Sequence, residues 1–304
     1  MAVGVGSFFL FAYFPPFAPL KHPLEHTAEI LTPVLIFAML LLTFCKVDVR
    51  DLTPRRWHLW LLLLQLVASS LLAGWAYVSH ETYKEVLEGI TVCLICPTAT
   101  AAAVITQKLG GKASSVATYT LGSNLLAALF VPLVFPLLEP SDNHTFLQTA
   151  GIILGKVFPT LVGPFLVAQL LRYVWPRLHA RLMSIHELAF YLWGVSLTIV
   201  CAQTTRSIVH STKSPGVELL IALGALLACV LQFVIGKQVG ERSGERISAG
   251  QSLGQKNTVL AIWMAYTFLD PVSAIAPGSY VLWQNSINSW QLWKKRKKDA
   301  ASKA

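Results

Sequence analysis

Long apolar stretches alternate with short polar ones along the whole chain. Each apolar stretch is close to the roughly 20 residues that a helix needs to cross a bilayer. Charged residues, Pro and Gly bound these stretches, which lie at about residues 4–20, 28–45, 57–79, 86–107, 114–138, 147–171, 183–204, 217–236, 247–268 and 272–293. The pattern predicts an all-α polytopic membrane protein with about ten transmembrane helices.

Composition agrees with a membrane protein and argues against other classes. Of the 304 residues, 54% are hydrophobic and 13% are charged, which leaves no room for a soluble domain of any size. The five cysteines lie in or beside apolar stretches, and Cys93 and Cys96 have no second pair or histidine cluster nearby to complete a metal site. Phosphate-loop, zinc-protease and serine-hydrolase motifs are absent, so we expect neither an enzyme nor a cofactor.

Basic residues are distributed unevenly between the loops. Twelve lie in every second loop and six follow the last apolar stretch, whereas four lie in the remaining loops. Because cytoplasmic segments are rich in Lys and Arg, we expect both termini in the cytoplasm, a basic cytoplasmic tail at 294–304, and residence in the cell (inner) membrane. The net charge of +9 then reflects topology, and not nucleic-acid binding. Lys156 and Lys256 remain inside expected helices, where Lys156 either snorkels or lines a cavity.

The chain divides into two halves of five expected helices each, at about residues 1–140 and 141–293. An odd number of helices per half inverts the second half relative to the first, as in many secondary transporters. The most irregular stretches, Pro97–Thr100 and Gly250–Asn257, occupy corresponding positions in the two halves. Interrupted helices of this kind mark binding sites in transporters, so the sequence predicts a single transporter domain over 1–304.

Four segments resemble the bile acid:sodium symporter family: Cys96–Thr106, the Gly-Gly-Lys turn at 110–112, Gly254–Ala261 and Pro277–Asn285. The resemblance extends in order and spacing over nearly the whole chain. It implies a panel domain made of the first, second, sixth and seventh helices, and a core domain made of the others. It also implies that the fourth and ninth helices are broken and cross at mid-membrane, with two sodium ions near the crossing and an organic anion between the domains.

This sequence has other residues at most of the positions that the resemblance implies as sodium ligands. Ala102 and Ala103 stand where the family typically has Ser-Asn, and a methyl group cannot coordinate sodium, which needs oxygen ligands. In the later motif, Ser252 stands in place of the acidic ligand and Lys256 in place of the glutamine ligand. We therefore expect degenerate sodium sites, with no bound metal.

Lys256 leads to the main hypothesis from the sequence. We expect its ammonium group to lie about where a sodium ion would lie, bonded to neighbouring carbonyl groups and to Gln65. Thr120 is the second oxygen-bearing position that survives, while Gln255 and Asn257 favour a polar cavity around Lys256 over a lipid face. The alternatives are that Lys256 loads and releases a proton, that it anchors a substrate carboxylate, or that it snorkels to the interface.

Five polar residues are the expected substrate contacts. Thr98 and Thr100 flank the break expected in the fourth helix, and Asn257 lies at the break expected in the ninth helix. Gln284 and Asn285 follow Trp283 in the tenth helix. The resemblance implies that Thr100, Asn257, Gln284 and Asn285 face the substrate. For each threonine, the alternative is a hydroxyl bonded back to its own helix.

Together these features predict a secondary transporter of an organic anion, bile-acid-like or a smaller carboxylate, that works by alternating access without sodium. A sodium- or proton-coupled symporter of the same family is one alternative, and a membrane sensor or binding protein that does not transport is another. The expected partners are the small anion and the lipid bilayer, and no feature points to a nucleic acid or names a protein partner.

Overall fold

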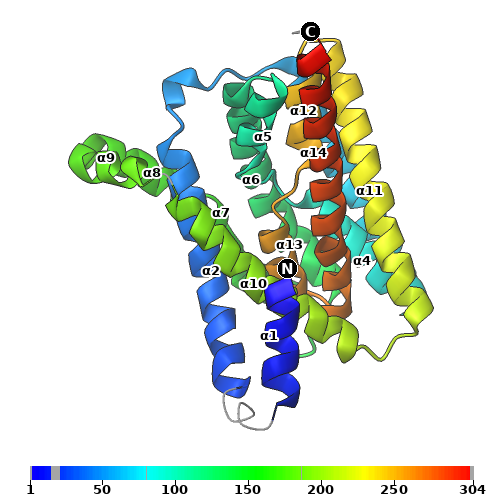
Figure 1. The fold of residues 1–304 in the computed structure, drawn as a ribbon. Helices are drawn as coiled ribbons and strands as arrows, with labels where there is room; N and C mark the ends of the chain where they lie inside the picture. Colours follow the sequence, from blue (N-terminus) through cyan, green and yellow to red (C-terminus); the bar gives the residue numbers. More distant parts are fainter. Residues whose placement is uncertain (1, 15–20, 80, 186, 302–304) are drawn as a thin grey trace.

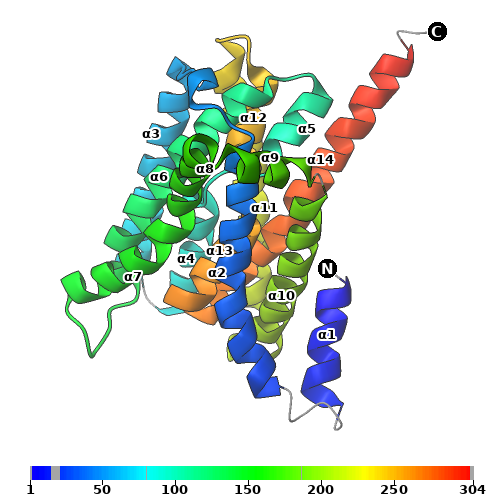
Figure 2. The ribbon, with the colours of Figure 1, turned by 90° about the vertical axis from the view of Figure 1, so that its left-hand side faces the viewer.

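The computed structural model describes residues 2–14, 21–79, 81–185 and 187–301. Within these ranges the chain forms α-helices joined by short turns, with no strand beyond one isolated bridge (Figures 1 and 2). The helices are α1 (Ala2–Tyr13), α2 (Lys21–Cys45), α3 (Arg56–Val78), α4 (Glu81–Ile95), α5 (Ala102–Leu109), α6 (Ala113–Leu138), α7 (Phe146–Leu161), α8 (Gly163–Val174), α9 (Pro176–Ser184), α10 (Leu188–Val209), α11 (Pro215–Glu241), α12 (Arg246–Gly254), α13 (Thr258–Phe268) and α14 (Ile275–Ala301), with 3-10 turns η2 (Val49–Asp51) and η3 (Pro271–Ala274).

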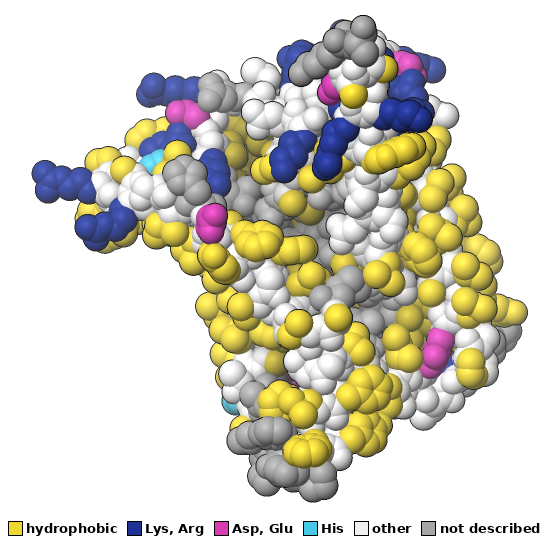
Figure 3. All heavy atoms as spheres, viewed as in Figure 1, with side chains coloured by type: hydrophobic (Ala, Val, Ile, Leu, Met, Phe, Trp, Pro, Cys, Tyr) yellow, Lys and Arg dark blue, Asp and Glu magenta, His cyan; other side chains and the backbone are white. Residues whose placement is uncertain are grey.

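Several helices are long and apolar enough to cross a membrane. Among the described residues there are five such helices, in α2, α3, α6, α10 and α11, and six if the bent pair of α7 and α8 counts as one span. Hydrophobic side chains cover the middle of the face seen in Figure 3, and Lys and Arg side chains gather toward the end where the C-terminus lies. The chain is therefore a polytopic membrane protein, as the apolar pattern predicts.

Two expected helices are interrupted. The stretch at 86–107 forms α4 and α5 with a non-helical segment between Ile95 and Ala102, and the stretch at 247–268 forms α12 and α13 with a break at 255–257. Both interruptions fall at the irregular positions that the sequence shows. They place four helix ends in the interior of the bundle.

The region between 146 and 209 differs from the prediction of two straight helices. The expected helix at 147–171 bends by 40° between α7 and α8. Pro164 follows Gly163 at the start of α8, where a residue without an N–H group costs no helical hydrogen bond. The expected helix at 183–204 begins only at Leu188. The chain before it forms α9, a short basic helix without a buried residue that packs against the end of α2 at the edge of the bundle (Figure 1).

Both ends of the chain also differ from the expected boundaries. The expected first helix at 4–20 ends at Tyr13, and its part at 15–20 lies outside the described residues. The expected tail at 294–304 continues α14 as a helix to Ala301, since no Pro or Gly interrupts the run of Lys and Arg after the last apolar stretch.

Glycines allow α11 and α12 to pack backbone to backbone. A Cβ atom added to Gly236 would lie 2.7 Å from the Ala249 carbonyl oxygen, and one added to Gly240 would lie 2.7 Å from the Glu245 carbonyl oxygen. Small residues permit this close approach between membrane helices, where dispersion forces and not hydrophobic burial drive packing. The contact fixes α12 beside α11. Because α12 ends at the break at 255–257, the contact also fixes one side of that break.

Candidate functional site

The two breaks lie side by side and run antiparallel. The Ala99 backbone N–H donates to the Gln255 carbonyl at 2.8 Å, and the Asn257 backbone N–H donates to the Pro97 carbonyl at 2.9 Å. Unwound backbone in the interior of a membrane protein must have its polar groups satisfied by protein or water. The pairing does this where the carbonyl ends of α4 and α12 meet the N–H ends of α5 and α13.

Lys256 is buried at the centre of this crossing. Its side chain is 1% exposed, and Nζ donates to the Leu94 carbonyl in the last turn of α4 at 2.8 Å. Its backbone N–H donates to Oε1 of Gln284 on α14 at 2.9 Å. Within the described part of the chain Lys256 forms no ion pair. The ammonium group therefore meets the partial negative charge of a helix carbonyl end in place of a carboxylate.

Gln65 of α3 bonds to the same end of α4. Its Nε2 donates to the Ile95 carbonyl at 2.7 Å, and its Oε1 accepts from the Tyr119 hydroxyl at 3.0 Å. Lys256 and Gln65 thus bond to successive carbonyl groups, and no hydrogen bond joins the two side chains. The expected bond to carbonyl groups is present, whereas the expected direct bond between Lys256 and Gln65 is not.

Hydroxyl groups occupy the other side of the crossing. Thr98 Oγ1 donates across to the Ser252 carbonyl of α12 at 2.7 Å, so this hydroxyl does not bond back to its own helix. The Thr98 backbone N–H donates to Ser123 Oγ of α6 at 3.3 Å. The Ser252 hydroxyl and the Gln255 side-chain oxygen are both buried without a hydrogen-bond partner among the described residues.

The remaining predicted residues contribute less to the crossing. Asn257 caps α13, because its Oδ1 accepts from the Leu260 N–H at 3.3 Å. The Thr120 hydroxyl donates to the Val116 carbonyl of its own helix at 2.8 Å. Thr100 is half-buried in the first break, and Asn285 is exposed beside the buried Gln284.

Lys156 lies elsewhere. Its side chain is exposed on α7, and its Nζ is 5.9 Å from the centroid of the Phe268 ring. This geometry is that of a cation over an aromatic face, which is favourable without a buried polar site. Lys156 is therefore not part of the crossing.

The sequence did not reveal the residues that close the carbonyl end of α12. The Tyr280 hydroxyl of α14 donates to the Gly254 carbonyl at 2.8 Å and accepts from Gln232 Nε2 of α11 at 3.1 Å. Cys96 Sγ donates to the Asn257 carbonyl at 3.0 Å. One signal was available, because Gln232 is a lone amide inside an otherwise apolar stretch, and such residues usually have a buried partner.

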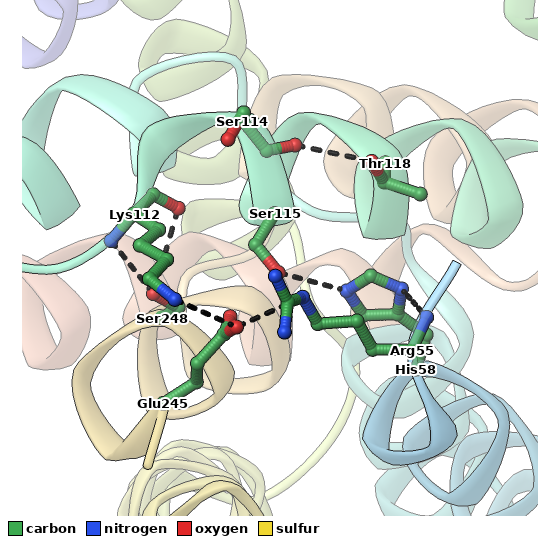
Figure 4. A network of polar contacts seen from close by, with 8 residues as sticks. All are labelled: Arg55, His58, Lys112, Ser114, Ser115, Thr118, Glu245 and Ser248. Carbon is green, nitrogen blue, oxygen red and sulfur yellow. Dashed lines mark hydrogen bonds and ion pairs between the residues drawn. The ribbon is translucent and has the colours of Figure 1, made fainter. Parts of the chain in front are cut away.

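A second polar network lies at the start of α12 (Figure 4). The Glu245 side chain is 1% exposed and pairs with Arg55 Nε at 2.9 Å and with Lys112 Nζ at 3.5 Å. Ser248 Oγ accepts from the Lys112 backbone N–H at 2.9 Å. The network joins the segments that precede α3, α6 and α12, so it holds together the ends of the helices that support the crossing.

His58 extends this network as a neutral group. Its Nδ1 accepts from the Arg55 backbone N–H at 3.0 Å, which assigns the ring proton to Nε2. Nε2 lies 3.2 Å from Ser115 Oγ on α6 and donates to it. The side chain thus links the first turn of α3 to α6 (Figure 4).

An apolar cavity of about 320 Å³ lies between α1, α2, α10 and α13. Phe8, Phe11 and Tyr266 contribute aromatic walls, and Glu29, Gln203 and Arg206 contribute polar groups of both charge signs. None of the five predicted substrate residues is among the described residues that line it. Mostly apolar walls with a few polar groups are typical of sites for small organic molecules.

Comparison with known proteins places the chain in a family. The family model described as the Sodium Bile acid symporter family matches residues 32–211, which is 180 of the 304 residues and includes the first break. No curated protein matches the chain. Because the match covers more than half of the sequence, the chain belongs to the sodium bile acid symporter family.

Proposed function

We propose that this protein carries an organic anion across the membrane by alternating access without sodium, and that Lys256 replaces a sodium ion. The chain is a multi-pass membrane protein of a family of transporters of bile-acid-like solutes. The observation that carries the sodium-independent assignment is the Lys256 ammonium, which is buried at 1% exposure, lies 2.8 Å from the carbonyl end of α4 and has no carboxylate partner in the part of the chain that the structure describes.

Occupied carbonyl oxygens support the replacement. Leu94 O accepts from Lys256 and Ile95 O from Gln65, while on α12 Ser252 O accepts from Thr98 and Gly254 O from a tyrosine. Half-helix carbonyl ends are the groups that coordinate coupling ions in many transporters. Here protein donors occupy these ends, and the side-chain oxygens that the family offers at Ala102 and Ala103 are lacking.

The proposed architecture has ten crossings in two inverted halves. The broken pairs α4 with α5 and α12 with α13, and the bent pair α7 with α8, each count as one crossing, α9 counts as none, and seven single helices supply the rest. The panel then contains α1, α2, α7 with α8, and α10, and the core contains the other crossings. Both termini lie in the cytoplasm, because the basic loops lie on their side.

The cavity supports an amphipathic organic anion as the substrate class. It lies between three proposed panel helices and α13 of the proposed core, which is where a sliding core exposes a site to alternate sides of the membrane. Its aromatic walls suit the apolar body of such an anion, and Arg206 adds a cation to a lining that also includes Glu29. Of the residues predicted to contact substrate at the crossing, Thr100 and Asn285 keep side chains that are accessible to a ligand.

Uptake into proteoliposomes tests this function. The full chain is reconstituted, and labelled taurocholate is used as the probe in sodium chloride or in choline chloride of equal ionic strength. We expect equal uptake in the two salts, and uptake reduced by about tenfold or more in Lys256→Met. Lys156→Met is the matched control, since this exposed lysine lies outside the crossing, and it should transport like the wild type.

Two results would contradict the proposal. Uptake that requires sodium would overturn the replacement of the ion by Lys256. Binding of the probe to the purified chain, seen as a raised thermal midpoint, without any uptake would indicate a binding or sensory protein on this fold.

A further inference from the structure

Two buried carboxylates on α4 take no part in the crossing. The Glu88 residue is 0% exposed and Glu85 is 7% exposed. Oε2 of Glu88 lies 2.9 Å from Ser273 Oγ of η3, whereas Oε1 of Glu88 is buried without a hydrogen-bond partner among the described residues. An ionised carboxylate loses several kcal/mol of hydration on burial unless donors surround it, and the described residues offer Glu88 a single hydroxyl donor.

The charges around Glu88 do not balance. Lys84 Nζ is 3.7 Å from Glu88 Oε1 but 2.7 Å from Glu139 Oε1, so its closest contact is with Glu139. Lys213 Nζ pairs with Glu85 at 2.5 Å. The described charged residues that act on Glu88 are Lys84 and Glu85 on α4, Glu139 after α6, and Lys213 through Glu85. This cluster of three carboxyl groups and two ammonium groups has one acid in excess.

The contacts of Ser273 favour a neutral Glu88. Ser273 Oγ lies 2.9 Å from Glu88 Oε2 and 3.4 Å from the Glu85 carbonyl oxygen. A hydroxyl group has one proton, so an ionised Glu88 and the Glu85 carbonyl compete for it. A protonated Glu88 removes the competition, because its carboxyl donates to Ser273 Oγ and Ser273 then donates to the Glu85 carbonyl.

Close packing keeps water away from this group. A Cβ atom added to Gly89 would lie 2.8 Å from the Ser273 carbonyl oxygen and 2.7 Å from Ala276 Cβ. The backbone of η3 and the start of α14 therefore lie directly against α4 beside Glu88. Separation of η3 from α4 is the movement that would admit water to the carboxyl group.

We propose that Glu88 is a proton-binding site, which holds its proton while η3 packs on α4 and releases it to water when this contact opens. Glu88 precedes Leu94 by six residues, or roughly 9 Å along α4. Its protonation thus sets the charge on the same half-helix whose carbonyl end binds Lys256. Coupling of this proton to solute movement rests on the proposed transport function, but proton binding by Glu88 does not.

Infrared spectroscopy of the purified full chain in lipid tests proton binding directly. A protonated carboxyl group has a carbonyl stretch that an ionised carboxylate lacks. We expect this band in the wild type at neutral pH and its loss in Glu88→Gln. Glu241→Gln, which changes an exposed glutamate on α11, should keep the band. Ser273→Ala supplies a second variant, in which the band should shift because the carboxyl group loses its acceptor.

The outcomes separate the site from the function. A band that is absent at neutral pH, or that persists in Glu88→Gln, would overturn the proton site. If the band behaves as expected but taurocholate uptake in an inward proton gradient is the same in Glu88→Gln and wild type, the proton site stands and its coupling is overturned. Loss of the gradient dependence in Glu88→Gln, with downhill uptake retained, supports the coupling.

Discussion

Helix α12 lies between two buried charges of opposite sign, and they are held in different ways. Glu245 is the residue before its first turn, and Lys256 follows its last residue, Gly254, by two positions. Each charge lies near the helix end whose dipole favours it. Glu245 also meets two cations, Arg55 and Lys112, whereas among the described residues the Lys256 ammonium donates to the Leu94 carbonyl and forms no ion pair.

This difference separates a structural anchor from a functional group. The Arg55 and Lys112 side chains are 42% and 60% exposed, so the Glu245 network reaches solvent and needs no ligand to balance its charge. Lys256 is buried in the bundle and has no counter-charge among the described residues, and such an ionisable group inside a membrane protein points to function. We therefore expect changes at Glu245 to alter stability and changes at Lys256 to alter transport.

The largest effect on stability and uptake is expected from a change that displaces α12, because Glu245 and Lys256 lie at its two ends. Gly240→Val places a side chain against the Glu245 carbonyl and pushes α12 away from α11. We expect a loss of about 2–4 kcal/mol in unfolding free energy, together with loss of uptake. Thermal unfolding in detergent measures the first effect. Gly151→Val is the control, because nothing lies within 4 Å of a Cβ atom there, and an equal loss in that variant would contradict the account.

Lys256→Met should reduce uptake and leave stability nearly unchanged. A charge-assisted hydrogen bond contributes roughly 1.5–3 kcal/mol, so loss of the ammonium group should reduce uptake by about tenfold or more. The unfolding midpoint should change little, because methionine fills the site and removes a buried charge. A large fall in the unfolding midpoint with normal uptake per folded molecule would contradict this, because Lys256 would then be a structural residue.

Glu245→Gln should lower stability and leave uptake nearly unchanged. The variant keeps the side-chain volume but loses the ion pairs with Arg55 and Lys112, and we expect a cost of roughly 1–3 kcal/mol in unfolding free energy. Uptake by the folded fraction should stay close to that of the wild type. Chemical unfolding measured alongside uptake checks both points, and unaltered stability would mean that the network in Figure 4 is not an anchor.

Lys112→Met should have the smallest effect. Its Nζ is 3.5 Å from Glu245 and its side chain is 60% exposed, so the pair is screened by solvent and contributes less than about 1 kcal/mol. Arg55 remains to pair with Glu245 at 2.9 Å. A loss as large as that of Glu245→Gln would show that Lys112, and not Arg55, is the main partner.

Local patterns in the sequence predict much of this arrangement. Apolar stretches locate the membrane helices, and the polar residues around Thr98 and Lys256 mark the two breaks, because unwound backbone and buried charge are rare at membrane depth. Gln65 is predicted as a neighbour through the resemblance alone. Its partner, the carbonyl end of α4, follows only from the structure.

Contacts between distant segments were not predictable in this way. Lys112 and Glu245 are 133 residues apart, and each looks like an ordinary loop charge in the sequence. The length of the apolar stretch at 147–171 does not show that it bends, although Gly163 and Pro164 mark the start of α8, and the helix α9 is too short to stand out from a loop. Glu88 did carry a local signal, a carboxylate within an apolar stretch. The excess of acidic groups around it appears only in the structure, where Glu139 pairs with Lys84.

The thermal unfolding midpoint in sodium chloride and in choline chloride, at equal ionic strength, tests the central claim most directly. An ion that binds only the folded state raises the midpoint in proportion to the logarithm of its concentration. If Lys256 supplies the cation at the crossing, the wild-type midpoint is the same in the two salts. A midpoint that rises with sodium concentration in the wild type would contradict the account, because a sodium ion would then bind beside the lysine that is proposed to replace it.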